Sequence, residues 1–125
     1  GDFAKEYAES LFEGTGHIVL IADRDSVIAV AGAPKKEYLD KPVGRLLETS
    51  MDQRKSQMEN DPGHFEIIRD QHETYHALVI SPIIAGGDPI GAVILVSKDE
   101  KVEMTQLETK MAETAAAFLA KQMEQ

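Results

Sequence analysis

Two apolar runs joined by a Gly-Gly-Asp-Pro turn restrict the fold of this chain more than any other feature. The first run covers residues 75–84 and the second covers residues 92–96. Both are rich in β-branched residues, which favour strands over helices. Between them, Gly86 and Gly87 can adopt the positive φ angles of a tight turn, and Pro89 fixes the direction of the exit. The segment therefore predicts a β-hairpin.

A glycine-rich segment can also form a phosphate-binding loop. Such a loop needs a strand followed by backbone N–H groups at a helix N-terminus, usually with a lysine or a spaced G-x-G-x-x-G pattern. Neither feature is present, and the residues after Gly91 continue as an apolar strand. We therefore favour the hairpin.

The N-terminal quarter of the chain predicts a helix followed by a second hairpin. Over residues 2–13, apolar side chains recur at helical spacing, with Asp2 placed to cap the helix and Gly14 placed to end it. Residues 17–23 and 26–31 are short apolar runs separated by a polar pair, which is typical of a β-hairpin.

The middle of the chain predicts shorter elements. Residues 35–40 suit a single helical turn. A second helix with one apolar side is indicated by the spacing of Val43, Leu46, Leu47 and Met51. The polar run at residues 52–61 is expected to be solvated and mobile. Residues 65–69 and 75–80 are expected to pair around a turn at residues 70–74.

A long final helix is predicted from residue 101 or 102 to residue 125. The order of elements is then helix, two strands, helices, three or four strands, helix. Because hairpins join most of the strands, the sheet should be antiparallel with the helices on its faces. The predicted fold class is α+β, and 125 residues is the length of a single domain.

Composition argues against several classes of function. The 13 basic and 22 acidic residues give a formal net charge of −9 without a basic stripe, so this segment is not expected to bind nucleic acid or an anionic membrane. The chain has no cysteine, which excludes thiol catalysis, disulfides and thiolate metal sites. It shows no signal peptide and no apolar run as long as a membrane span, so we expect a soluble chain. The lack of cysteine suits a cytoplasmic location. The sequence starts in a helical pattern without Met, which predicts a fragment of a longer protein.

Two segments carry a resemblance to a known family. Residues 79–97, VISPIIAGGDPIGAVILVS, resemble the GAF domain family near the end of its sheet. Residues 14–44, together with the terminal helix, resemble the C-terminal regulatory half of a family of sporulation transcription regulators. In that family the GAF-like half follows an N-terminal AbrB-like DNA-binding domain, which is absent from this chain.

The resemblance implies a fold and a role. It implies a GAF-like antiparallel sheet with the N- and C-terminal helices packed together on one face and short helices and loops covering the other. It implies a non-catalytic sensor and oligomerisation domain that transmits binding of a small molecule to the missing DNA-binding domain. The alternatives are an assembly module without a ligand and a PAS-type sensor, which lacks a long C-terminal helix packed beside the first helix.

The ligands of other GAF domains are not expected here. The Asn-Lys-Phe-Asp-Glu type of motif found in cyclic-nucleotide-binding relatives is missing. Bilin attachment and the redox chemistry of GAF-fold methionine sulfoxide reductases both need cysteine. We therefore expect no cofactor and no enzyme activity.

Histidines and carboxylates give little support to a catalytic or metal site. His72 and His76 are four residues apart, but they fall in a turn and at a strand start, where that spacing does not put them on one side. No metal site is therefore expected. Acidic residues such as Glu108 and Glu113 are interpreted as parts of solvated helix faces. A paired nucleophile and base is not recognisable.

A small-molecule pocket is the more specific hypothesis. In the GAF fold that the chain resembles, ligands lie between one sheet face and a cover, which here would be residues 39–64. The residues able to reach inward from the cover or the facing strands are Arg45, Ser50, His64 and His76. Arg45 is the best candidate for binding an anion, although an exposed helix residue is the alternative interpretation.

The terminal helices have more apolar surface than one sheet face needs. The last helix carries one stripe at Met104, Leu107, Met111, Ala115 and Phe118, and a second at Ala112, Ala116, Leu119 and Met123. The first helix repeats this feature. Burying four large side chains per protomer would contribute about 12 to 24 kcal/mol gross to a dimer.

We therefore predict a homodimer through the terminal helices, with a tetramer as a further option in the full-length protein. The predicted interface residues are Tyr7, Leu11, Met111, Ala115 and Phe118. The alternative is that the broad apolar arc wraps one deeply seated helix of a monomer. An unidentified small molecule is the other predicted partner.

Overall fold

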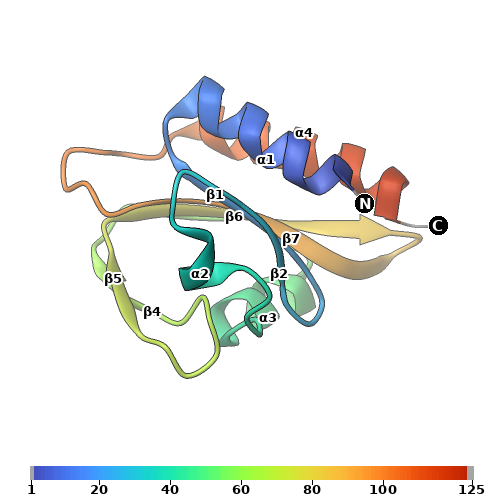
Figure 1. Ribbon diagram of the computed structural model, residues 1–125, viewed down its shortest axis with the longest axis horizontal. Helices are drawn as coiled ribbons and strands as arrows, with labels where there is room; N and C mark the ends of the chain where they lie inside the picture. Colours follow the sequence, from blue (N-terminus) through green and yellow to red (C-terminus); the bar gives the residue numbers. More distant parts are fainter. Residues whose placement is uncertain (1, 124–125) are drawn as a thin grey trace.

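The fold is built on a five-stranded antiparallel sheet. The computed structural model describes residues 2–123, and its strands follow the order β2-β1-β7-β6-β3 (Figure 1). Their bounds are Ile18–Asp23 for β1, Val27–Ala31 for β2, Gln57–Glu59 for β3, Ala77–Ala85 for β6 and Asp88–Ser97 for β7. The predicted hairpin is confirmed as the β6–β7 pair, in which Gly86 and Gly87 have φ angles of 58° and 85°.

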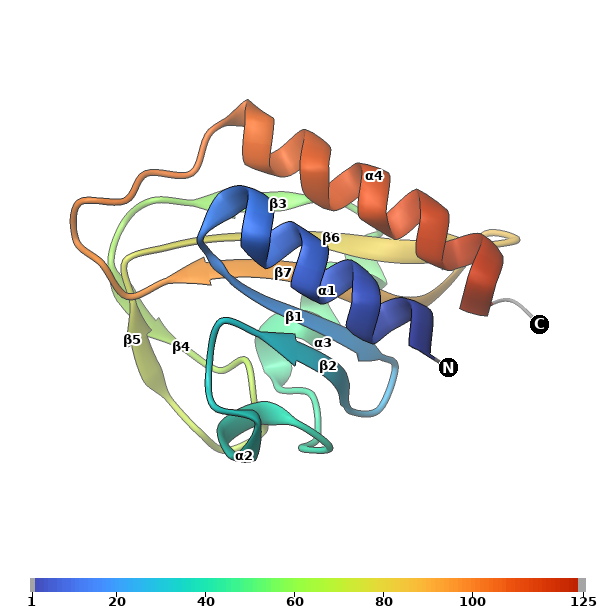
Figure 2. The same ribbon diagram turned by 45° about the horizontal axis from the view of Figure 1, so that its top comes forward.

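Two long helices cover one face of the sheet. Helix α1 spans Asp2–Thr15 and α4 spans Gln106–Met123. They lie side by side and run in opposite directions (Figure 2). No helix within residues 2–123 is long and apolar enough to cross a membrane. A long C-terminal helix packed beside the first helix is the feature that separates the predicted GAF-like fold from a PAS-type domain.

Small side chains bring these helices close to the sheet. Ala8 of α1 and Ala112 of α4 are fully buried, and they pack in the same core as Val19 and Leu95 of the sheet. Because alanine occupies little space, the helix backbone approaches the strands closely and the larger residues fill the gaps between them. The alanines of α4 that face the sheet, Ala112, Ala115 and Ala116, are therefore buried within one subunit.

The opposite face is covered by shorter elements. They are α2 (Lys35–Tyr38), α3 (Arg45–Gln53) and a separate two-stranded ribbon, β4 (Gly63–Phe65) with β5 (Glu73–Tyr75). Their large side chains fill a second core against the sheet. The fully buried members of this core include Tyr38, Leu47, Met51, Ile67 and Tyr75.

The end of α1 and the start of α4 differ from the sequence prediction. Helix α1 passes through Gly14 and ends at Thr15. The next residue, Gly16, has a φ of 75°, and its N–H donates to the Phe12 carbonyl at 2.8 Å. Helix α4 begins at Gln106 rather than at residue 101 or 102. The Glu108 carboxylate accepts the Thr105 N–H at 2.6 Å and the Thr105 hydroxyl at 2.7 Å, which forms a capping box.

The prediction of a mobile polar run at residues 52–61 is wrong. Residues 57–59 form the edge strand β3, which pairs with β6. Asn60 anchors the end of this strand, because its side chain donates to the Met104 carbonyl at 2.9 Å and accepts the Met104 N–H at 2.7 Å. Long-range partners order a segment whose local sequence shows no strand pattern.

The predicted pairing of residues 65–69 with residues 75–80 is also wrong. The ribbon forms earlier in the chain, where residues 63–65 pair with residues 73–75. Ile68 instead forms an isolated bridge with Val43, which lies before α3 rather than within it. Burial of the apolar pair at residues 67 and 68 against the sheet decides this geometry.

Candidate functional site

The two predicted ligand-binding residues of α3 lie in different environments. Arg45 is exposed at the start of the helix, and its backbone N–H donates to Glu66 Oε2 at 3.1 Å. This bond is the main cause that lowers the pKa of the Glu66 carboxyl. Ser50 is fully buried, and its hydroxyl donates to the Lys55 carbonyl at 3.2 Å. Ser50 therefore holds the chain that follows the C-terminal end of α3.

The two predicted ligand-binding histidines lie on the small ribbon and beside it. His64 is an exposed residue of β4, and its Nδ1 lies 3.1 Å from the Thr74 hydroxyl on the paired strand. His76 is half-buried between β5 and β6, and its N–H donates to the Ser97 carbonyl at 2.8 Å. Arg45 and Ser50 of α3 and His64 of β4 belong to the elements that cover this face of the sheet, whereas His76 lies between β5 and β6. None of the four lines any of the three cavities described below.

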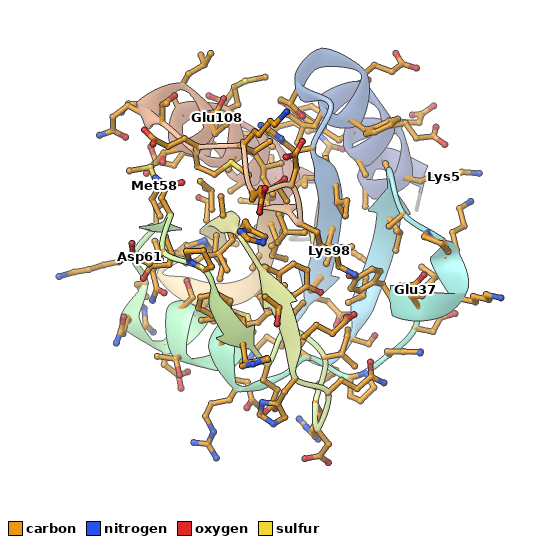
Figure 3. All side chains as sticks on the ribbon, turned by 90° about the vertical axis from the view of Figure 1, so that its left-hand side faces the viewer. Lys5, Glu37, Met58, Asp61, Lys98 and Glu108 are labelled. Atoms are coloured by element: carbon orange, nitrogen blue, oxygen red, sulfur yellow. The ribbon has the colours of Figure 1, made fainter. Side chains whose placement is uncertain are left out.

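Buried tyrosines occupy the centre of that side. The Tyr38 and Tyr75 hydroxyls lie 2.7 Å apart, and Tyr75 donates to Glu73 Oε2 at 3.1 Å. Lys98, near the middle of the view in Figure 3, lies 3.3 Å from Glu73 Oε1 and 5.6 Å from the centre of the Tyr75 ring. Burial raises the pKa of both tyrosines, so both hydroxyls stay protonated at neutral pH.

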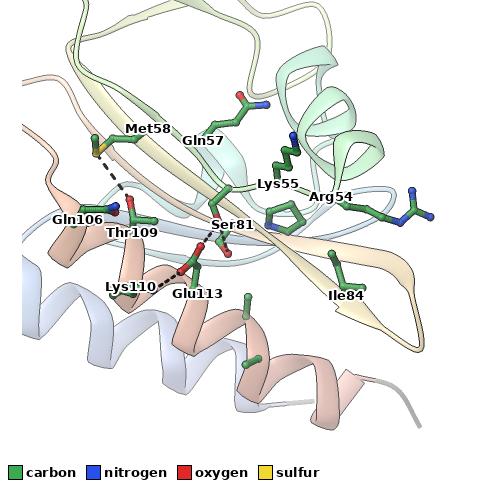
Figure 4. A pocket seen from close by; sticks show the side chains of 14 residues that line it. Arg54, Lys55, Gln57, Met58, Ser81, Ile84, Gln106, Thr109, Lys110 and Glu113 are labelled. Carbon is green, nitrogen blue, oxygen red and sulfur yellow. Dashed lines mark hydrogen bonds and ion pairs between the residues drawn. The ribbon is translucent and has the colours of Figure 1, made fainter.

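A cavity lies beside α4, on the other side of the sheet. It has a volume of about 780 Å³ and lies between α4, β6 and the segment from Arg54 to Met58 (Figure 4). Its fourteen lining residues are Arg54, Lys55, Ser56, Gln57, Met58, Ser81, Pro82, Ile84, Gln106, Thr109, Lys110, Glu113, Ala116 and Ala117. This volume is within the range of small-molecule sites in proteins.

A polar cluster crosses the middle of this cavity. The Ser56 hydroxyl donates to Glu113 Oε2 at 2.8 Å and hydrogen-bonds to the Ser81 hydroxyl at 3.2 Å. Lys110 Nζ lies 3.7 Å from the other oxygen of Glu113. No histidine is among the lining residues, so Ser56 lacks the partner that usually activates a serine nucleophile. The cluster is suited to binding rather than to acyl transfer.

Sequence reasoning missed the residues of this cluster. Glu108 and Glu113 were both expected on solvated helix faces, but Glu108 caps α4 and Glu113 bonds to Ser56. The first role was readable from the spacing of Thr105 and Glu108. The second was not, because Ser56 and Glu113 are separated by 57 residues and meet only through the fold.

The outer surface of the two long helices carries exposed apolar side chains. We define the aromatic band as Phe3 and Tyr7 of α1 with Leu107, Met111 and Phe118 of α4. The Phe118 ring lies 6.1 Å from the Phe3 ring and 5.3 Å from the Tyr7 ring, measured between centres. Phe3 is 51% exposed, Leu107 is 64% exposed and Phe118 is 38% exposed. An apolar groove of about 270 Å³ runs between Tyr7 and Met111.

The predicted interface residues divide between this band and the core. Tyr7 and Met111 are half-buried and Phe118 is exposed, so all three can reach a second copy. Leu11 and Ala115 are buried inside the subunit, with exposed fractions of 6% and 0%. A second copy would therefore contact a narrower surface than the full helix stripes.

Two of the histidines lie near carboxylates. His17 Nε2 lies 4.0 Å from Glu108, and His72 Nε2 lies 3.5 Å from Glu66. Within residues 2–123, no three His, Asp or Glu side chains come together in a metal-binding arrangement.

A third cavity, of about 380 Å³, lies where α1 and α4 meet the end of the sheet near Ile28.

Comparison with known proteins gives the family. The family model for "Stage V sporulation protein T C-terminal, transcription factor" matches residues 1–124. The chain belongs to this family. Over all 125 residues it is 50% identical to stage V sporulation protein T of Bacillus subtilis (strain 168), of which it covers 69%. The resemblance to sporulation regulators is thereby confirmed.

Solved structures confirm the fold of this chain. The GAF domain of an Acinetobacter phosphoenolpyruvate-protein phosphotransferase is similar with a TM-score of 0.76 at 12% identity, over 94% of this chain and 78% of that one. A type II free methionine-R-sulfoxide reductase from Thermoplasma acidophilum is similar with a TM-score of 0.74 at 14% identity, over 94% and 86%. At these identities the likeness shows the GAF-like α+β fold alone.

Proposed function

We propose that this domain is the non-catalytic regulatory and assembly module of a sporulation transcription regulator, and that the aromatic band joins two copies. The exposure of Phe3, Leu107 and Phe118 on adjacent helices is the observation that carries the proposal. An apolar surface shared by two packed helices is the kind of surface that a two-fold dimer buries as a four-helix arrangement. Membership of a transcription-factor family supports the regulatory part.

The exposed fractions set the strength of such a dimer. Each large side chain contributes about 1.5 to 3 kcal/mol when fully buried, so covering the exposed parts of Phe3, Leu107 and Phe118 on two protomers contributes about 5 to 9 kcal/mol gross. This is less than the sequence stripes suggest, because Leu11 and Ala115 are already buried. Docking costs about 4 to 15 kcal/mol. The isolated domain should therefore dimerise weakly.

In the regulator, a second point of attachment would strengthen this contact. We expect an N-terminal DNA-binding domain, so that two tethered copies of the present domain experience a high effective concentration. The angle at which two helix layers pair would then set the spacing of the DNA-binding domains. DNA would be contacted only through that domain, because this segment carries a net charge of −9. A regulator acting on bacterial DNA works in the cytoplasm.

Ligand sensing is the second candidate function. The predicted site under α3 is filled by Tyr38 and Tyr75, which favours assembly over ligand binding on that side. The cavity of about 780 Å³ beside α4 supports a sensor that binds its ligand elsewhere. Enzyme activity has little support: no histidine lines the cavity beside α4 to activate Ser56, and the chain has no cysteine for reductase chemistry.

Sedimentation velocity of the domain and its variants tests the assembly proposal. The wild-type domain should show a monomer–dimer equilibrium at about 100 μM. Leu107→Ser should weaken the dimer at least about tenfold, because the 64% exposed Leu107 is covered twice in a two-fold dimer. Met58→Ser is the matched control, since Met58 is 47% exposed on β3 outside the band. A dimer that both variants weaken equally would refute the proposal, as would a monomeric wild-type domain.

A further inference from the structure

The cavity beside α4 gathers positive charge in an acidic protein. Arg54, Lys55 and Lys110 are among its lining residues, and Glu113 is the one carboxylate among them. Lys110 is paired with Glu113 at 3.7 Å, whereas none of the six ion pairs in the described part of the chain includes Arg54 or Lys55. Two cations thus border the cavity without a partner of opposite charge.

Backbone contacts place Arg54 at one end of the cavity. Arg54 ends α3 in the left-handed conformation, with φ of 56° and ψ of 33°. Its Nε donates to the Gly87 carbonyl at 3.0 Å, which ties this corner to the β6–β7 turn. The chain then turns into β3, so Lys55 follows directly at the same end of the cavity, whereas Met58 and Thr109 lie at the other end (Figure 4).

The rest of the lining has an apolar part and a polar part. Ile84 of β6 and Ala117 of α4 offer apolar surface, and the buried Pro82 and Ala116 also line this part of the cavity. Ser56, already bonded to Glu113, separates this surface from the amide and hydroxyl groups toward Thr109. A cation pair next to an apolar surface is suited to a molecule with one anionic group and a short apolar body.

We propose that this cavity binds a small organic anion, a carboxylate or a phosphate monoester attached to an apolar chain. Lys55 supplies the charge that binds the anionic group, and Arg54 adds positive potential at the same end. The apolar chain lies over Pro82 and Ala117. The site is separate from the predicted cover-side pocket of Arg45, Ser50, His64 and His76, none of which lines the cavity.

Such a ligand would contact both the segment from Arg54 to Met58 and helix α4. Binding would then stabilise one placement of α4 relative to the sheet edge, and α4 provides three residues of the aromatic band. The regulatory consequence of binding rests on the proposed function. Ligand binding in the cavity does not depend on dimerisation, so the two proposals can fail separately and are tested by separate measurements.

Calorimetry with three probes of equal chain length tests the site. Hexanoate and hexyl phosphate carry the two candidate anionic groups, and hexanamide is the uncharged control. We expect one or both anions to bind with a Kd of about 1 mM or lower, and hexanamide to bind at least about tenfold more weakly. Amide resonances of Ser56, Met58, Thr109 and Glu113 should shift on titration. The stronger of the two anions identifies the anionic group that the site prefers.

Two substitutions separate this site from general charge effects. Lys55→Gln should weaken binding about tenfold, the cost of one charge-assisted hydrogen bond. Lys5→Gln removes the same charge from an exposed position on α1, and it should change the Kd less than twofold. Ala117→Leu should also weaken binding, because it fills the apolar part of the cavity. Ala117 is exposed, so the fold tolerates this change.

Four results would overturn the proposal. They are no heat from either anion at about 10 mM, equal affinity for hexanamide, equal weakening by Lys5→Gln and Lys55→Gln, and resonance shifts confined to residues near His64 and His76. If the wild-type domain sediments as a monomer but still binds hexanoate, the assembly proposal is rejected and the binding proposal stands.

Discussion

Replacing Tyr75 by Phe removes one hydroxyl from the centre of the cover side and keeps the ring. That hydroxyl bonds to the Tyr38 hydroxyl at 2.7 Å and to Glu73 at 3.1 Å. The two partners respond differently to its loss. Tyr38 is 1% exposed, so water cannot take over its bond, whereas the Glu73 side chain is 37% exposed and can be hydrated again.

The cost follows from this difference. Leaving the buried Tyr38 hydroxyl without a partner costs about 1 to 3 kcal/mol, and losing the bond to the hydrated Glu73 costs about 0.5 kcal/mol more. Tyr75→Phe should therefore lower the free energy of unfolding by about 2 to 3 kcal/mol. Tyr38→Phe leaves the Tyr75–Glu73 bond in place and should cost only about 1 kcal/mol. The larger change corresponds to a fall in Tm of about 10 °C.

Urea denaturation of the three Tyr→Phe variants measures these differences. Tyr7→Phe is the control, because the Tyr7 ring packs against Phe118 at the outer surface of the helices. It should change the free energy of unfolding by less than about 0.5 kcal/mol. Equal effects at Tyr75 and Tyr7 would refute the inference that the buried hydroxyl network stabilises the cover side.

Three further predictions concern pH, the start of α4 and the sheet. Burial raises the pKa of Tyr75, so the unfolded chain loses this proton at a lower pH than the folded chain. The free energy of unfolding should therefore fall as pH rises above about 10. The urea midpoint of Tyr75→Phe should depend less on pH in this range than the midpoint of the wild type. Thr105→Ala removes the capping box with Glu108 and should cost about 1 kcal/mol, measured by thermal unfolding with circular dichroism, whereas an unchanged Tm would argue against the cap. Gly91→Ala places a Cβ against the Ala22 carbonyl oxygen of the neighbouring strand and should cost about 1 to 3 kcal/mol by urea titration, and a neutral effect would show that β1 and β7 can separate there.

Local patterns predicted the parts of the fold that local interactions determine. The two hairpins follow from glycine or polar turns between β-branched runs, and Gly86 and Gly87 have the backbone angles that the turn needs. The end of α1 was predicted two residues early, because Gly14 and Gly16 are equally plausible stops in sequence and only Gly16 takes a positive φ. The start of α4 was readable from Thr105 and Glu108 but was overlooked.

Features that depend on distant segments could not be predicted. Strand β3 at residues 57–59 has a polar sequence and exists because the edge of β6 offers it hydrogen bonds. The cavity beside α4 combines three separate segments, so the pairing of Ser56 with Glu113 left no trace in sequence spacing. The excess apolar surface of the terminal helices was visible in the sequence, but its division between core and surface was not. Ala115 is buried and Phe118 is exposed although they are three residues apart.

The central claim is that the aromatic band is the surface through which two copies meet. Isotope-filtered NMR on a mixture of labelled and unlabelled domain tests it most directly, because only contacts between different copies are detected. The account predicts intermolecular NOEs from the Phe118 ring to methyl groups of Leu107 or Met111. Intermolecular NOEs confined to residues outside the band, in a sample that sedimentation shows to be dimeric, would contradict it.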